Sequence, residues 1–101
     1  MKGVGEPALI VEGATIRGVA DSASLSPDVP AIDVQGRIIT PGLIDIHTHG
    51  AVGHSFQEAS EAAFGAITRE QVTRGVTSIL ATISTGPVSE MLCSAEFCRQ
   101  W

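Results

Sequence analysis

The sequence lacks the features that most directly indicate a membrane or a nucleic acid as a partner. It has no run of about 18 apolar residues, so a transmembrane helix is excluded. Lys and Arg together number six, they are scattered along the chain, and the formal net charge is −5. Because a nucleic-acid-binding surface gathers basic residues on one face, we expect neither nucleic acid nor membrane as a partner.

Cysteine is also scarce, and the motifs of several cofactor-binding classes are missing. Cys93 and Cys98 are the two cysteines, and their spacing places them on different faces of a helix. We expect two reduced thiols. No Cys-x-x-Cys, Gly-x-Gly-x-x-Gly or Walker motif is present. Glu6 and Pro7 stand where a signal peptide needs its apolar core, which predicts a cytoplasmic protein.

What remains is the composition of a small folded protein in two parts. Of the 101 residues, 44% are hydrophobic and 17% are charged, as in globular chains. In residues 8–40, short β-like runs alternate with turn residues, which predicts an antiparallel β-module with turns at Glu12-Gly13 and Gln35-Gly36. Residues 21–30 are expected to be a loop. The flanking strands are expected at Ala8–Val11 and Ala14–Arg17, and at Ile32–Val34 and Arg37–Thr40.

From Pro41 the pattern changes to apolar strands that alternate with amphipathic helices. This order predicts a right-handed parallel βαβ unit, and in such folds ligands gather at the carboxyl ends of the strands. The expected elements are a strand over Leu43–His49, a loop over Gly50–Glu58, a helix over Glu61–Arg74 between Ser60 and Gly75, a strand over Val76–Ile83 and a second helix. The second helix is expected to present an apolar face of Val88, Met91, Leu92, Ala95 and Cys98.

The most informative segment is Ile39–Gly50, which reads Ile-Thr-Pro-Gly-Leu-Ile-Asp-Ile-His-Thr-His-Gly. A Pro-Gly turn begins a short apolar run that ends in His47 and His49. In a β-strand, alternate side chains share a face, with Cα atoms about 6.5–7 Å apart. Two imidazoles placed in this way can bind one ion at the Zn–N distance of about 2.0–2.1 Å. We therefore predict that His47 and His49 are metal ligands at the end of a buried strand.

Other polar residues around the histidines have more than one interpretation. Asp45 is expected on the face of the histidines, where it either orients a ligand imidazole or pairs with a group elsewhere. His54, in the following loop, is interpreted first as a solvated histidine and second as a substrate contact. The Ser and Thr residues of segment 77–85 fit a strand and a turn, so we do not assign them to phosphate binding.

The run Pro41–Gly50, preceded by a β-module, resembles the start of amidohydrolase superfamily members, which are metal-dependent hydrolases on a (β/α)8 TIM barrel. Gly50–Phe56 and Gly75–Thr85 look like the corresponding parts of the N-acetylglucosamine-6-phosphate deacetylases, and the Met-Pro-Asn segment of dihydroorotase-like relatives is absent. The resemblance implies an incomplete amidohydrolase fold of the α/β class. Residues 1–40 would be the N-terminal part of a small β-sandwich-like module, and residues 41–101 the first two βα units of a truncated barrel.

The resemblance also implies a function. A divalent metal, zinc or iron, held by His47 and His49 would activate a water for attack on the acetamide of an amino sugar phosphate. The products would be acetate and glucosamine-6-phosphate. The general acid/base and the remaining ligands are expected on later strands, so we place no catalytic residue within this chain and expect the 101 residues alone to be inactive. The implied partners are the small-molecule substrate and, for the complete protein, a second copy in a homodimer.

Two alternatives stay open. One keeps the superfamily and changes the substrate to another amide, a cyclic amide or an amino-heterocycle, since nothing in these residues recognises the sugar or the phosphate. The other is a non-catalytic, truncated module that binds metal weakly.

Overall fold

We describe residues 5–101 from a computed structural model of the chain. They form two compact units, of which one ends at Ile38 and the other begins at Ile39. No helix within residues 5–101 has the length and apolarity that crossing a membrane requires. The assignment of residues 1–40 and 41–101 to named parts of a larger fold stays a prediction.

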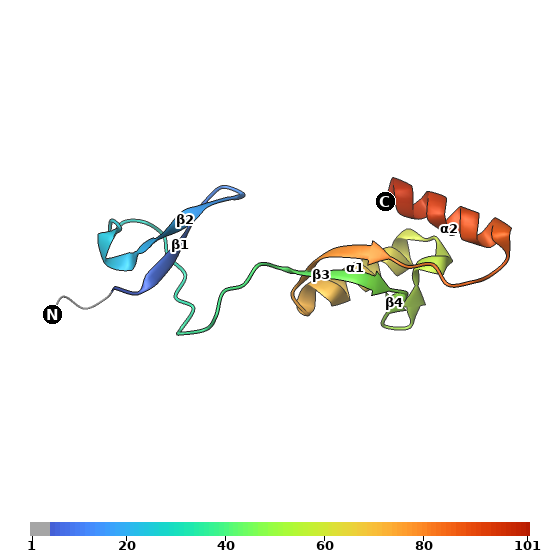
Figure 1. The fold of residues 1–101 in the computed structure, drawn as a ribbon, viewed down its shortest axis with the longest axis horizontal. Coiled ribbons are helices and arrows are strands. Elements are labelled where there is room, and N and C mark those ends of the chain that lie inside the picture. The colour runs from blue at the N-terminus through green and yellow to red at the C-terminus, as the bar shows by residue number, and fades with distance from the viewer. Residues whose placement is uncertain (1–4) are drawn as a thin grey trace. The chain divides into compact units, whose positions relative to one another are not determined.

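The first unit is built on one antiparallel hairpin, as predicted (Figure 1). Its turn lies at Gly13-Ala14, one residue later than the predicted Glu12-Gly13. Glu12 pairs with Thr15, and Gly13 between them has a φ of +59°, which glycine adopts without a steric penalty. The Asp21 side chain then caps a short 3-10 helix. The elements are β1 (Pro7–Glu12), β2 (Thr15–Asp21) and η1 (Ser22–Ser24).

The second hairpin predicted in this unit is wrong. Gln35 and Gly36 do form a turn, with φ values of +55° and +71°. The residues on either side of it, however, form no strand in the part of the chain that the structure describes. The reason is lack of cover: Ile32 and Ile38 are 91% and 89% exposed, and a two-stranded ribbon is marginal in water unless another layer packs on it.

The second unit contains the predicted parallel βαβ arrangement (Figure 1), with β3 and β6 side by side. The segment predicted as a loop between β3 and α1 instead forms a two-stranded hairpin and a 3-10 helix. The elements are β3 (Leu43–Thr48), β4 (Gly50–Ala51), β5 (His54–Ser55), η2 (Phe56–Glu58), α1 (Glu61–Thr73), β6 (Val76–Ala81) and α2 (Val88–Gln100).

Local signals set the bounds of α1 as the sequence predicts. The Ser60 side chain accepts a hydrogen bond from the Ala63 N–H, which satisfies one of the free donors at the helix start. Gly75 follows the helix with a φ of +82°, the left-handed conformation typical of a residue beyond a helix end. Its carbonyl accepts from the Leu43 N–H at 2.8 Å, so the chain after α1 meets the start of β3.

The core of the second unit lies between the sheet and the helices. Phe56, Phe64 and Ile67 are fully buried, and Ile79 and Ala81 of β6 pack against them. The rings of Phe56 and Phe64 meet edge to face, with centroids 4.9 Å apart. Each such side chain contributes about 1.5–3 kcal/mol through burial. One face of the β3–β6 sheet is therefore covered.

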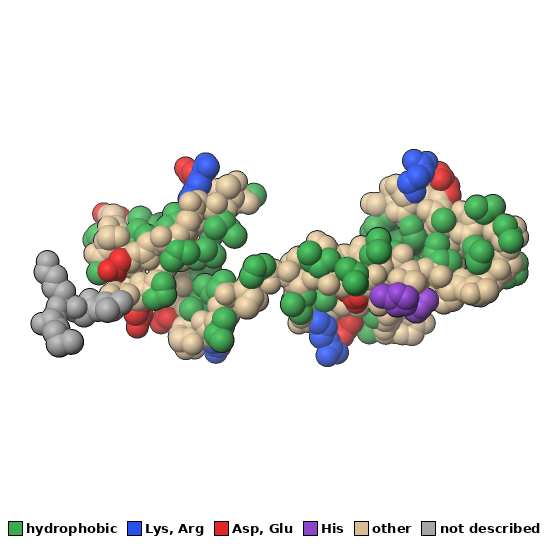
Figure 2. Space-filling view, viewed as in Figure 1, with side chains coloured by type: hydrophobic (Ala, Val, Ile, Leu, Met, Phe, Trp, Pro, Cys, Tyr) green, Lys and Arg blue, Asp and Glu red, His purple; other side chains and the backbone are tan. Residues whose placement is uncertain are grey.

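The other face of this sheet is open. Ile44 and Ile46 of β3 are 70% and 72% exposed, and Leu80 of β6 is 64% exposed. The prediction that the histidines end a buried strand is therefore wrong for this chain. Two strands with helices on one side cannot cover both faces, so the apolar run of β3 meets solvent (Figure 2).

The apolar face predicted for α2 is also only partly correct. Val88 and Leu92 are 67% and 65% exposed, whereas Ser94 is 1% exposed. The helix is oriented by a Ser94 hydroxyl that reaches η2 and by Phe97, whose ring centroid lies 4.9 Å from that of Phe64. Because of these two contacts, α2 buries Ser94 and leaves Val88 and Leu92 of the predicted apolar face exposed.

Candidate metal centre

The end of β3 brings the two predicted ligands together. The rings of His47 and His49 lie edge to face, with centroids 5.2 Å apart and an interplanar angle of 82°. Both side chains are exposed, and Figure 2 shows histidine side chains gathered on the surface of this unit. Neutral imidazole is a common ligand for zinc and iron, so the chemistry of this pair fits a divalent ion.

The pair nevertheless falls short of a complete centre. Within residues 5–101, no group of three or more His, Cys, Asp or Glu side chains is placed to hold a metal. Catalytic zinc usually has three protein ligands. The described chain thus offers two ligands, and their role in metal binding stays a prediction.

Asp45 makes a contact that neither expectation named, and the two expected roles stay predictions. Its Oδ1 accepts a hydrogen bond from the main-chain N–H of His47 at 3.0 Å, and the residue is half-buried. The register of the β3–β6 pairing shifts between Asp45 and Thr48, the two half-buried positions of the strand. Strict alternation is therefore broken here. The carboxylate holds the backbone that carries His47, and it does not bind an imidazole among the described residues.

Ser84 is the residue near the histidines that sequence reasoning missed. Its Oγ lies 2.9 Å from Nδ1 of His49, although the two residues are 35 positions apart. The Thr82 N–H donates to the Thr48 carbonyl at 2.9 Å, which places the chain after β6 beside the end of β3. Its position in the sequence was the signal that could have identified it. A residue that follows the second of two adjacent parallel strands lies near the residue that follows the first. A serine there fits a turn equally well.

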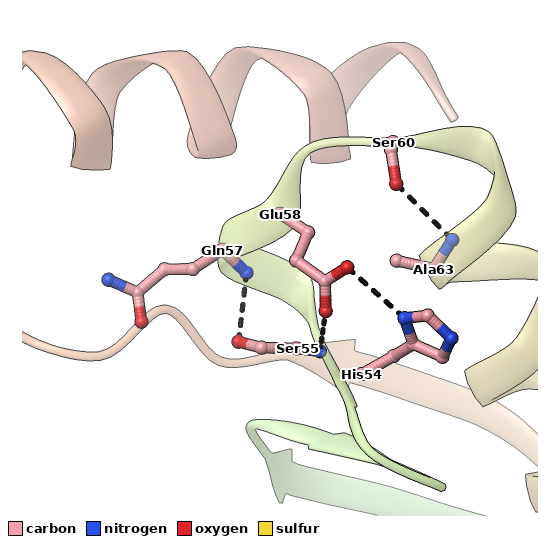
Figure 3. Close-up of polar contacts among 6 residues, drawn as sticks. All are labelled: His54, Ser55, Gln57, Glu58, Ser60 and Ala63. Carbon is pink, nitrogen blue, oxygen red and sulfur yellow. Dashed lines mark hydrogen bonds and ion pairs between the residues drawn. The ribbon is translucent and has the colours of Figure 1, made fainter.

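His54 belongs to a small hydrogen-bonded group at the start of η2 (Figure 3), so it is not a free loop histidine. Its Nδ1 lies 3.1 Å from Oε2 of Glu58. The other Glu58 oxygen accepts from the Ser55 N–H at 2.7 Å, and Ser55 Oγ accepts from the Gln57 N–H at 3.1 Å, which completes a capping box. The Ser55 N–H, and secondly His54, lower the pKa of the Glu58 carboxyl.

One hollow of the second unit lies away from these histidines. It is an apolar groove of about 530 Å³ lined by residues of α1, β6 and α2, including Phe64, Ile79 and Cys98. Burial raises the pKa of the Cys98 thiol. Neither His47 nor His49 lines this groove, so cavity size does not identify the candidate centre.

Comparison with known proteins identifies one family and relatives with two different names. A sequence model described as "Amidohydrolase family" matches residues 38–99. The chain is 30% identical over 95 residues to the N-acetylglucosamine-6-phosphate deacetylase of Haemophilus influenzae, with 93% of this chain and 25% of that protein covered. It is 31% identical over 97 residues to the imidazolonepropionase of Pseudomonas aeruginosa, with 91% and 24% covered.

A third relative matches a shorter stretch. The N-acetylglucosamine-6-phosphate deacetylase of Vibrio furnissii is 38% identical over 53 residues, which cover 52% of this chain and 13% of that protein. The chain spans about a quarter of the length of the first curated relatives it matches. No solved structure matches it significantly.

Proposed function

The chain belongs to the amidohydrolase family, and on this premise we propose that it forms the N-terminal part of a metal-dependent hydrolase of C–N bonds. Residues 41–101 would be the first two βα units of its (β/α)8 barrel, and residues 1–40 part of a β-sandwich-like module. The order β3, α1, β6 and α2 supports this proposal. So do Ile44 and Ile46, since their open face is the kind that further barrel strands cover.

His47 and His49 would hold the divalent ion, zinc or iron, that this family generally uses. The support is the closeness of the two rings at the carboxyl end of β3, where barrel enzymes place their chemistry. When bound, such an ion would supply the Lewis-acid chemistry that hydrolysis of an amide requires. Asp45 would contribute by fixing the main chain at His47. Dimerisation of the whole protein stays a prediction.

The substrate we propose is N-acetylglucosamine-6-phosphate, whose acetamide would be hydrolysed to acetate and glucosamine-6-phosphate. The support comes from the segments Gly50–Phe56 and Gly75–Thr85, which look like those of the deacetylases, and from the Haemophilus influenzae relative. Both segments flank the candidate centre, because one follows His49 directly and the other includes Ser84.

A second candidate function is that of an imidazolonepropionase. The Pseudomonas aeruginosa relative supports it as strongly by identity, at 31% against 30%. This candidate falls within the alternative of an amidohydrolase with a cyclic substrate. Under this proposal both functions would use His47 and His49 and would act on different substrates, so one set of proteins tests both.

The test is hydrolysis by the full-length gene product, with acetate release from N-acetylglucosamine-6-phosphate measured beside consumption of imidazolonepropionate. We expect acetate release, and we expect His47→Ala and His49→Ala to lose both metal and activity. His54→Ala is the matched control, because this histidine pairs with Glu58, and it should keep its metal. Cleavage of imidazolonepropionate alone would reject the deacetylase function and support the imidazolonepropionase function. Absence of both activities in a metal-loaded protein would reject both functions and leave an amidohydrolase with another substrate or a non-catalytic module.

A further inference from the structure

The two histidines of the candidate centre are not equivalent. The Nδ1 atom of His49 lies 2.9 Å from Ser84 Oγ, whereas the His47 ring makes no hydrogen bond to another side chain within residues 5–101. The contact with Ser84 is supported by the backbone, because the Thr82 N–H donates to the Thr48 carbonyl at 2.9 Å. Ser84 itself is half-buried, which limits its freedom to turn away. One imidazole is therefore held at a defined nitrogen and the other is not.

The chemistry of imidazole gives this difference a consequence. A neutral ring carries its proton on one nitrogen and binds metal through the other, and the partner of the protonated nitrogen decides which is which. A serine hydroxyl can accept an N–H as well as donate its own hydrogen. With Nδ1 of His49 facing Ser84, the nitrogen that stays available for a metal is Nε2.

We propose that Ser84 is a positioning residue that stabilises the Nδ1–H form of His49 and so makes Nε2 the metal-binding atom. This inference rests on the proposed function, since it assumes that His49 is a ligand. It assigns a role to a residue of the β6–α2 connection, outside the His-x-His segment. A partner of this kind typically changes metal affinity about 10-fold to 100-fold when it is removed.

The test uses the 15N-histidine-labelled chain at pH 8.5 and at a concentration at which it is monomeric. Ring nitrogens are observed by NMR while Zn²⁺ is added, and His49→Ala assigns the signals. We expect zinc to shift Nε2 of His49 and to leave a proton on Nδ1. Ser84→Ala should change the His49 ring signals of the metal-free chain and weaken zinc binding about tenfold. Ser84→Thr, which keeps the hydroxyl, should bind zinc as the unmodified chain does.

The matched control is Thr85→Ala, which removes an exposed neighbouring hydroxyl that has no bond to an imidazole among the described residues. Equal zinc binding by Ser84→Ala and Thr85→Ala would overturn the proposal. Attachment of zinc through Nδ1 of His49 would also overturn it. This measurement uses the unmodified chain, so it decides the question even if Ser84→Ala fails to fold. If His49→Ala loses zinc and Ser84→Ala does not, the role of Ser84 is rejected and the proposed centre stands. If zinc still binds to the His47→Ala and His49→Ala variants, the role of Ser84 and the proposed metal centre are both rejected.

Discussion

Gly50 lies directly against the carbonyl oxygen of His54, on the facing strand of the β4–β5 hairpin. A Cβ at position 50 would overlap that oxygen and would lie 2.8 Å from the Cα of Ser55. Both neighbours are backbone atoms, so neither can move aside as a flexible side chain would. The residue after His49 therefore has to be glycine for this hairpin to close beside the candidate centre.

Gly50→Ala should consequently destabilise the second unit by about 1–3 kcal/mol, the usual result of forcing an extra methyl into a packed site. Urea unfolding of the chain measures the loss. Gly53→Ala is the control, because Gly53 has a φ of +82° but open space where a Cβ would lie. That variant meets backbone strain alone and should lose about 1 kcal/mol. Equal losses in the two variants would contradict the overlap with His54.

Val52 occupies an unfavourable conformation at the tip of the same hairpin. Its φ is +49°, and with Gly53 at +82° it forms a two-residue turn in which both φ values are positive. Such turns favour Asn followed by Gly, and a β-branched residue is strained there. Val52→Asn should therefore raise stability by about 1 kcal/mol, measured as a higher midpoint of thermal unfolding.

The control for this change is Val72→Asn, at a similarly exposed valine within α1. Asparagine is no better a helix former than valine, so this variant should gain nothing. A gain of similar size at both positions would show that the effect comes from removing exposed apolar surface and not from the turn.

Ser94 joins α2 to η2. Its hydroxyl oxygen lies 3.0 Å from the Gln57 carbonyl and 3.0 Å from the Glu90 carbonyl, and the residue is 1% exposed. Ser94→Ala should lower stability by about 1 kcal/mol, because it removes a buried hydrogen bond between two elements. Hydrogen exchange of the α2 amides should also become faster. Ser89→Ala, at an exposed serine of the same helix, should change neither quantity. Equal effects of both variants would contradict a stabilising hydrogen bond between Ser94 and Gln57.

Acid should weaken the capping box at η2. The Ser55 N–H and then His54 lower the pKa of Glu58 in the folded protein, so the ionised carboxylate stabilises the fold above the ordinary carboxyl pKa. This contribution is lost as the pH falls through the lowered value. As the pH falls below the ordinary carboxyl pKa, the thermal midpoint should therefore drop more steeply in the unmodified chain than in Glu58→Gln.

His54→Ala separates the two causes. Because the Ser55 N–H is the larger of them, most of this pH dependence should persist when the imidazole is removed. Parallel curves for the unmodified chain and Glu58→Gln would show that the carboxylate does not contribute in this way.

Much of the second unit follows from its residues alone. Ser60 and Gly75 mark the ends of α1 through hydrogen bonding and backbone conformation that depend on immediate neighbours. The apolar runs around Ile44 and Ile79 become parallel strands, because a strand–helix–strand sequence usually forms a right-handed crossover between parallel neighbours. The family could be identified from Pro41–Gly50, because a short strand that ends in His-x-His carries its chemistry within a few residues.

Other features were decided by the tertiary structure. Ser84 meets His49, and Ser94 meets Gln57, only because segments far apart in the chain are packed against one another. Asp45 turns to the backbone where the β3–β6 register shifts, which strict alternation does not predict. A periodic pattern indicates which side chains are apolar, but which of them are buried depends on the surfaces that the rest of the chain provides. Local preferences thus determine elements, whereas contacts between distant segments determine the partners of the site residues.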